Sequence, residues 1–166
     1  MQFTLNIPDA ECQSIENISF GWFDGFHSSH RFFLNSLKSQ HGKTLLLVFL
    51  PSSNHYNNPS SKILQTETEK RNSFSRINDF YTHFIPVPEN RNLSFVQKLM
   101  KEALEACPTV RKIIVPDIMD YPEGTLRCSE LLSDYGYFHQ KNIIIEEIIL
   151  PDPVFSANII KLIENG

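Results

Sequence analysis

The stretch that decides the fold reads Thr44-Leu45-Leu46-Leu47-Val48-Phe49-Leu50 and is closed by Pro51. A continuous apolar run of this length is typical of a strand buried on both faces, as in a parallel sheet. Upstream, residues 18–23 read as a strand, and from Ser28 the apolar spacing becomes helical until Gly42 stops it. This order predicts two parallel strands joined by a crossover helix.

The same alternation continues toward the C-terminus. Strands are expected over residues 81–87, 112–115 and 142–150, and helices over residues 67–77, 125–135 and 156–164, with a further helix that Ser94 caps. Thr66 is the expected N-cap of the helix over 67–77, and Gly136 is the expected stop of the helix over 125–135. Strands that alternate with helices predict an α/β fold, with a parallel sheet and helices on both faces. Residues 51–61, rich in Ser, Asn and Pro, are predicted to be a loop.

Composition narrows the class of protein further. The 166 residues suit a single domain over 1–166, and a net charge of -4 gives no bias toward nucleic acid or an anionic membrane. The longest apolar runs are far shorter than the roughly 20 residues that cross a bilayer. Three widely spaced cysteines without a CxxC pair, and an N-terminus unlike a signal peptide, predict reduced thiols and a cytoplasmic location.

Ligands of open α/β sheets bind beyond the carboxyl ends of the strands, which directs attention to the first strand–helix junction. That junction reads Phe20-Gly21-Trp22-Phe23-Asp24-Gly25-Phe26-His27-Ser28-Ser29-His30. Its two glycines let the backbone turn sharply and approach a ligand closely. His27 and His30 stand three residues apart at a helix start, where backbone amides and imidazoles can both bind phosphate. The junction therefore favours a polyphosphate ligand.

Other interpretations of these residues stay open. One of the two imidazoles could lie on the surface while the other is a satisfied, partly buried group. A metal site formed by Asp24, His27 and His30 is conceivable, but catalytic zinc sites need three well-placed ligands with supporting partners, so no metal ligand is assigned. The remaining histidines are interpreted as surface or core groups. The charged residues at 67 and 69–71 are interpreted as a solvated helix face.

The stretch from Gly21 to His30 resembles the G-x-F-D-G-x-H-x-G-H motif of the nucleotidylyltransferase superfamily. Within that superfamily it is most similar to the FMN adenylyltransferase domain of bacterial bifunctional riboflavin kinase/FAD synthetases. Weaker similarities follow in the expected order at residues 48–51, 113–117 and 155–161. The resemblance implies a Rossmann-like sheet of the nucleotidylyltransferase type.

The resemblance also implies an activity, namely transfer of AMP from ATP to FMN, which yields FAD and pyrophosphate and uses Mg²⁺. The implied partners are small molecules, with neither nucleic acid nor membrane among them. The resemblance assigns His27, His30 and Lys161 to the transfer itself. It assigns nucleotide binding to Gly21, Phe23, Asp24, Gly25, Ser29, Ser156 and Asn158. It places Asp117 and Ile118 in the loop that binds the flavin.

The chain departs from the family pattern at several of these positions. Ser29 replaces the last glycine of the motif, Lys161 replaces an arginine, and Asn158 replaces a threonine. Only Asp117 agrees with the flavin loop. Two alternatives therefore stand beside an active FMN adenylyltransferase: a degenerate nucleotide-binding homologue with impaired catalysis, and a nucleotidylyltransferase with another phosphate acceptor. Since the riboflavin kinase part of the bifunctional proteins has no counterpart here, riboflavin phosphorylation is not expected from these residues.

Overall fold

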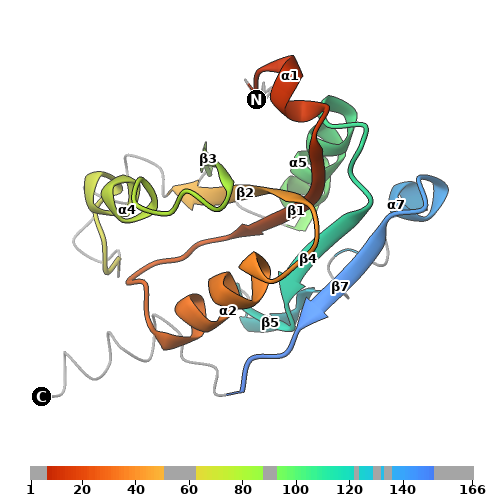
Figure 1. The fold of residues 1–166 in the computed structure, drawn as a ribbon. Helices are drawn as coiled ribbons and strands as arrows, with labels where there is room; N and C mark the ends of the chain where they lie inside the picture. Colours follow the sequence, from red (N-terminus) through yellow and green to blue (C-terminus); the bar gives the residue numbers. More distant parts are fainter. Residues whose placement is uncertain are drawn as a thin grey trace, which may run out of the picture.

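The computed structural model describes residues 7–50, 63–87, 93–121, 124–128, 132 and 136–151 (Figure 1). The elements in chain order are α1 (Asp9–Cys12), β1 (Ile15–Gly21), α2 (Ser28–Lys38), β2 (Lys43–Leu50), α4 (Glu67–Phe74), β3 (Tyr81–Pro86), α5 (Leu93–Ala106), β4 (Lys112–Pro116), β5 (Ile118–Tyr121), β6 (Gly124–Arg127), α7 (Gly136–Gln140) and β7 (Ile144–Ile148).

The main sheet has five strands in the order β3-β2-β1-β4-β7, and every neighbouring pair is parallel. The chain builds outward from β1 through β2 to β3, then crosses to the other side of β1 for β4 and β7. The strand order therefore reverses between β1 and β4. Strand β2 is buried along its whole length except at Lys43, as the apolar run predicts.

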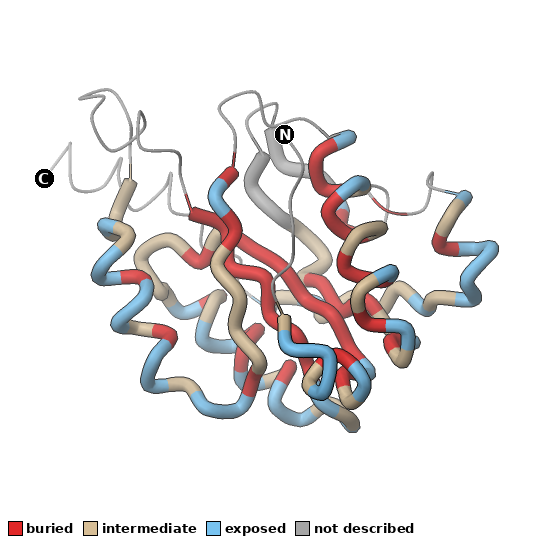
Figure 2. The backbone as a smooth tube through the Cα atoms, turned by 90° about the horizontal axis from the view of Figure 1, so that it is seen from above, coloured by how far each residue is buried: buried red, intermediate tan, exposed pale blue. Residues whose placement is uncertain are grey.

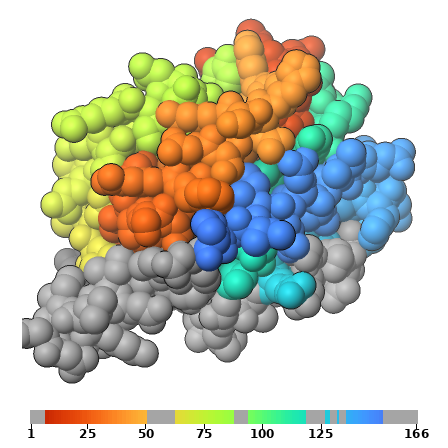
Figure 3. Space-filling view, turned by 60° about the horizontal axis from the view of Figure 1, so that its bottom comes forward, coloured from red at the N-terminus to blue at the C-terminus, as the bar shows by residue number. Residues whose placement is uncertain are grey.

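Helices cover both faces of this sheet, and the alternation of β2 side chains explains why. Leu45, Leu47 and Phe49 face the cluster that contains the apolar side of α5, whereas Leu46 and Val48 face the cluster that contains α2 and the end of α4. Buried backbone accordingly runs through the middle of the molecule, with exposed positions on the outer sides of the helices (Figure 2). The space-filling view shows α2 between the α4–β3 region and β7 (Figure 3). The predicted fold class is confirmed as an α/β fold: a parallel sheet with helices on both faces. The nucleotidylyltransferase type of this sheet stays a prediction.

Several predicted elements are confirmed with shifted ends. Helix α2 begins at Ser28 as predicted, and Thr66 caps α4 through a reciprocal capping box with Glu69. Helix α4 ends at Phe74 rather than at residue 77. Strand β1 ends at Gly21 because Phe23 has φ +46, which no strand accommodates. Strand β7 begins at Ile144, after a turn in which Asn142 has φ +53.

The helix predicted over residues 125–135 is wrong in its first part. Gly124–Arg127 form β6, which pairs antiparallel with β5, for example Met119 with Leu126. Helix α7 then begins at Gly136, the residue expected to end a helix. Ser94 lies inside α5 rather than before it, because this helix begins at Leu93. The loop predicted over 51–61 and the helix over 156–164 lie outside the described residues.

The three cysteines are free thiols and are buried. Burial, together with the neighbouring Cys12, raises the pKa of Cys107 to about 12, so this thiol stays protonated at neutral pH. In the part of the chain that the structure describes, no helix is long and apolar enough to cross a membrane.

Candidate functional site

The candidate site lies between the end of β1 and the start of α2, at the carboxyl edge of the central strand. Strand β1 ends at Gly21, and α2 begins at Ser28. Its neighbour β4 ends at Pro116, so Asp117 follows β4 at the same edge of the sheet. The reversal of strand order between β1 and β4 makes this edge the place where open α/β sheets bind ligands.

The turn after β1 has an unusual backbone. Phe23 and Phe26 both have φ +46, and Gly25 has φ +79. Left-handed conformations are strained for residues with a side chain and persist only where the surroundings enforce them. A side chain at Gly25 would also meet the Leu64 Cδ1 atom at 2.5 Å, and one at Gly21 would meet the Phe23 ring at 2.9 Å. Because Gly25 and Gly21 have no side chain, Leu64 and Phe23 can pack directly against the backbone of the turn.

Asp24 holds this turn against the chain that leads into α4. Its Oδ2 atom accepts the backbone N–H of Leu64 at 2.8 Å, and its Oδ1 atom accepts that of Gln65 at 3.0 Å. In return the Gly25 N–H donates to Gln65 Oε1 at 3.2 Å. Both carboxylate oxygens are thus engaged with the backbone. Among the described residues, no group of three His, Cys, Asp or Glu side chains is placed to hold a metal ion.

His27 and His30 form a stacked pair at the start of α2. Their ring centroids lie 3.7 Å apart with 25° between the planes. His30 also packs edge-on against Phe23, at 5.4 Å between centroids. The Nδ1 atoms of both histidines are buried and have no hydrogen-bond partner in the described structure. Buried polar atoms without partners are rare in folded proteins, so these two atoms call for an explanation.

Both imidazoles are neutral at pH 7. Burial lowers the pKa of His30 to about 3, and the neighbouring His27 ring and the ammonium of Lys70 lower it further. Burial also lowers the pKa of His27, although the carboxylate of Asp24 works against that change. A neutral imidazole has one N–H donor and one acceptor nitrogen. Each ring can therefore donate one hydrogen bond to a phosphate, and neither ring carries a positive charge before the phosphate binds.

Lys70 is a site residue that the sequence analysis missed. The sequence pattern places Lys70 on a solvated helix face, but its side chain is fully buried. Its ammonium donates to the carbonyl of Trp22 at 2.7 Å and to that of Phe49 at 3.3 Å. Burial lowers the pKa of Lys70 to about 8, and Asp24 partly opposes the shift. The one sequence signal is that Lys70 lies four residues before the buried Phe74, on the same side of α4.

The remaining predicted residues lie in three places. Ser29 is buried in the first turn of α2, next to the histidine pair in sequence. Asp117 joins β4 to β7: its N–H donates to the Ile148 carbonyl at 3.0 Å, and its Oδ1 atom accepts the Leu150 N–H at 3.1 Å. Ile118 begins β5. Ser156, Asn158 and Lys161 lie outside the described residues.

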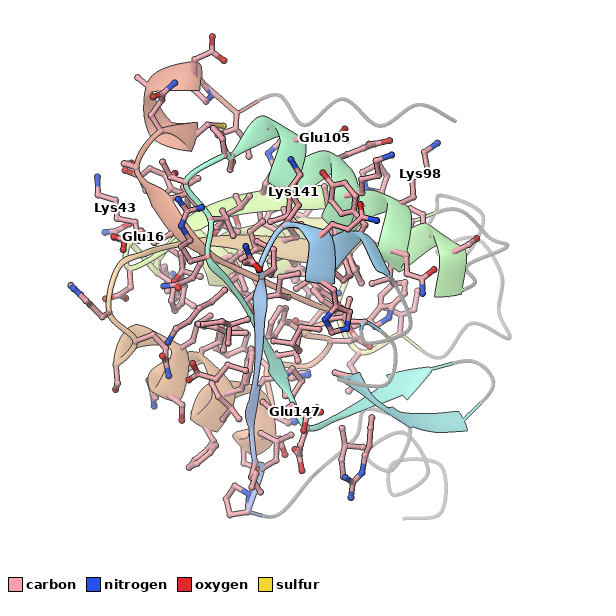
Figure 4. All side chains as sticks on the ribbon, turned by 90° about the vertical axis from the view of Figure 1, so that its right-hand side faces the viewer. Glu16, Lys43, Lys98, Glu105, Lys141 and Glu147 are labelled. Carbon is pink, nitrogen blue, oxygen red and sulfur yellow. The ribbon has the colours of Figure 1, made fainter. Side chains whose placement is uncertain are left out.

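The hairpin of β5 and β6 stands where the resemblance places a flavin loop. The carbonyl of Asp117 accepts the Cys128 N–H at 3.2 Å, which ties the end of the hairpin to its beginning. Burial raises the pKa of the Cys128 thiol, and the carboxylates of Glu147 and Asp117 raise it further. Figure 4 shows Glu147 on β7, close to where the hairpin leaves the sheet.

Comparison with known proteins supports the fold and no more. No family model matches the chain, and no curated protein is similar to it in sequence. Among solved structures, a macrolide-efflux protein from Streptococcus pneumoniae is similar with a TM-score of 0.51 and 13% sequence identity. The similarity covers 82% of this chain and 46% of that one, so the chain spans less than half of that structure. At this identity the likeness shows a shared α/β fold.

Proposed function

We propose that the chain is an ATP:FMN adenylyltransferase, which joins AMP from ATP to FMN and releases pyrophosphate. The observation that carries this proposal is the His27–His30 pair at the start of α2, with both Nδ1 atoms buried and without partners in the described structure. The pair lies beyond the carboxyl end of the central strand, where the amides at the start of α2 also favour an anion.

The reaction needs few groups from the protein. A phosphate oxygen of FMN attacks the α-phosphorus of ATP, a new P–O bond forms there, and the bond to the pyrophosphate oxygen breaks. The protein mainly positions the reactants and stabilises the charge that spreads over the phosphorus oxygens. Imidazole N–H groups of His27 and His30 would donate to those oxygens.

The donor set at the turn fits Mg²⁺ that is carried by the phosphates. Both oxygens of Asp24 accept backbone N–H groups, so this carboxylate does not provide a cage for a cation. Mg²⁺ commonly keeps several waters and binds through substrate phosphates. When bound with ATP, it would neutralise part of the triphosphate charge.

The position of Asp117 supports an acceptor site beside the nucleotide site. Asp117 and Ile118 follow β4, and His27 follows β1, its direct neighbour in the sheet. An acceptor bound beyond β4 and a triphosphate bound beyond β1 would therefore meet at the reversal of the strand order. This arrangement suits a transfer between two phosphate-bearing molecules.

A second candidate is a nucleotide-binding homologue with impaired catalysis. The observation that favours it is Ser29, a buried side chain where the family motif has glycine. A buried hydroxyl next to the histidine pair takes up space that a nucleotide could otherwise use. In this case ATP binds, but no AMP is transferred.

Incubation of the protein with ATP, Mg²⁺ and FMN, followed by chromatography, tests the proposal. FAD and pyrophosphate should accumulate with repeated turnover above a control without enzyme. Absence of FAD at high protein concentration, with ATP binding detected by calorimetry, would establish the second candidate. If pyrophosphate is released only when a different phosphate acceptor is present, that acceptor and not FMN is the substrate. If Ser29→Gly gains activity over the original chain, crowding by the hydroxyl limits the site.

A further inference from the structure

Lys70 is the one fully buried lysine in the described structure, and its charge is not used by the proposed reaction. Its two hydrogen-bond acceptors, the carbonyls of Trp22 and Phe49, belong to the turn after β1 and to the end of β2. Both acceptors are uncharged, and Asp24 acts on the ammonium through space. A buried ammonium bound by uncharged carbonyls is screened less by water than an exposed one, although the Asp24 carboxylate offsets part of its field.

The field of Lys70 reaches the candidate site. Lys70 is close enough to His30 for its charge to lower the pKa of that imidazole. The Trp22 carbonyl that it binds precedes Phe23, the first left-handed residue of the turn. Lys70 therefore contacts the base of the turn that carries the histidines, while its charge acts on their rings.

We infer that Lys70 is the buried cation of this site: it fixes the turn that presents His27 and His30, and it attracts the phosphates of a nucleotide without touching them. This inference rests on the proposed function for the identity of the ligand, ATP. Lys70 is a positioning residue, since the turn separates it from the place where phosphate would bind. A positive charge in a low-dielectric setting attracts a polyanion more strongly than a solvated one does.

The charged groups around Lys70 determine what pH does to this attraction. From the turn and α2 these are Asp24, His27, His30 and Arg31, whose Nε atom donates to the Phe26 carbonyl at the exposed rim. Its own helix adds Glu67, Glu69 and Arg71, of which Arg71 is paired with Glu67. Phe49, the β2 residue whose carbonyl it binds, is uncharged. Strand β3, which packs against α4 through Phe84, adds His83, whose pKa is lowered by burial and by Arg71. Of these groups, Lys70 is the one expected to change charge near pH 8.

The test measures the affinity of ATP with Mg²⁺ by calorimetry at several values from pH 7 to 9.5. The original chain should lose about tenfold in affinity across this range as the ammonium loses its proton. A neutral amine still donates to both carbonyls, so a merely structural role predicts no such loss. Lys70→Met should bind ATP about tenfold more weakly at pH 7 and show little further loss at higher pH.

Lys98→Met is the matched control. Lys98 lies on the outer side of α5 with its side chain 55% exposed, and Figure 4 shows it pointing away from the sheet. This variant should follow the original chain at every pH. A pH profile of Lys70→Met that equals that of the original chain overturns the inference. If Lys70→Met does not fold, a flat profile of the original chain between pH 7 and 9.5 overturns it equally.

A measurement without ligand separates this inference from the proposed function. The pKa of lysine is about 10.5 in the unfolded chain and about 8 here, so the unfolded chain binds more protons between these values. Resistance to urea should therefore rise from pH 8 toward 10.5 more in the original chain than in Lys70→Met. If resistance to urea depends on pH in the same way in the two chains, Lys70 is not a buried cation. If they differ as expected but the original chain binds no ATP, the proposed function and the phosphate role of Lys70 fail together.

Discussion

The carboxylate of Asp24 accepts the backbone N–H of Gln65 at 3.0 Å, although the two residues are 41 positions apart in the chain. The neighbouring N–H of Leu64 donates to the other oxygen of the same carboxylate. An aspartate at the centre of the candidate site thus links the β1–α2 turn to the residues that lead into α4. Its charge is also close enough to favour the protonated forms of His27 and Lys70.

Asp24→Ala should lower the free energy of unfolding by about 1–3 kcal/mol, because two backbone N–H groups lose their acceptors. Urea denaturation at pH 7 measures this change. Asp79→Ala is the control, since it removes a carboxylate from the exposed Lys38–Asp79 ion pair, where a loss below about 1 kcal/mol is expected. Equal losses in the two variants would contradict the linking role of Asp24.

Gly25→Ala should destabilise the protein by about 1–2 kcal/mol, because alanine is strained at φ +79 and its Cβ atom would press on Leu64. Gly136→Ala tests the opposite case, since nothing lies within 4 Å of a Cβ atom placed there. That variant should be neutral or more stable by up to about 1 kcal/mol. The midpoints of thermal unfolding of both variants measure these changes. A Gly25→Ala variant as stable as the original chain would show that the turn tolerates a side chain.

Acid should destabilise the fold through His30. The pKa of this imidazole is about 3 in the folded protein and about 6.5 in the unfolded chain, so the unfolded chain binds more protons between these values. Stability is then lost as the pH falls below about 6.5, by about 2 kcal/mol at pH 5. Urea midpoints at pH 7 and pH 5 should differ less in His30→Gln. His139→Gln, at an exposed position in α7, should keep the full acid sensitivity.

His27→Ala and His30→Ala should each lower FAD formation by about 10²-fold or more, if each imidazole donates to the transition state. The rate of FAD formation at saturating ATP and FMN measures this loss. His41→Ala is the control, because His41 is exposed and lies just before β2, at the amino edge of the sheet. Unchanged turnover in both site variants would refute the catalytic role of the pair.

Local patterns in the sequence predicted most of the sheet, while the assignment of a site to the β1–α2 junction stays a prediction. The apolar run of β2, the Thr66 cap and the His27–His30 spacing each depend on residues close together in the chain. The helix predicted over residues 125–135 is wrong where it overlaps β6, because the pairing of Gly124–Arg127 with Ile118–Tyr121 outweighs the helical spacing of the residues that follow.

The missed parts of the site depend on distant contacts. Lys70 lies among polar residues on α4, and nothing nearby in sequence shows that its acceptors are carbonyls of Trp22 and Phe49. Likewise, Asp24 was predicted to line a nucleotide site, and only the fold shows that both its oxygens are bound by the backbone of residues 64 and 65. Burial of a lysine is set by the helix packing above the sheet, which single-sequence periodicity does not contain.

The left-handed turn at Phe23, Gly25 and Phe26 has a consequence for the order of folding. Its backbone is unfavourable on its own, and the contacts that enforce it come from residues about 40 positions later in the chain. Closing that long loop is a late event compared with the formation of a helix or a neighbouring strand pair. We therefore expect the candidate site to form only when α4 docks. In native-state hydrogen exchange, the amides of Gly25, Leu64 and Gln65 should open as one unit.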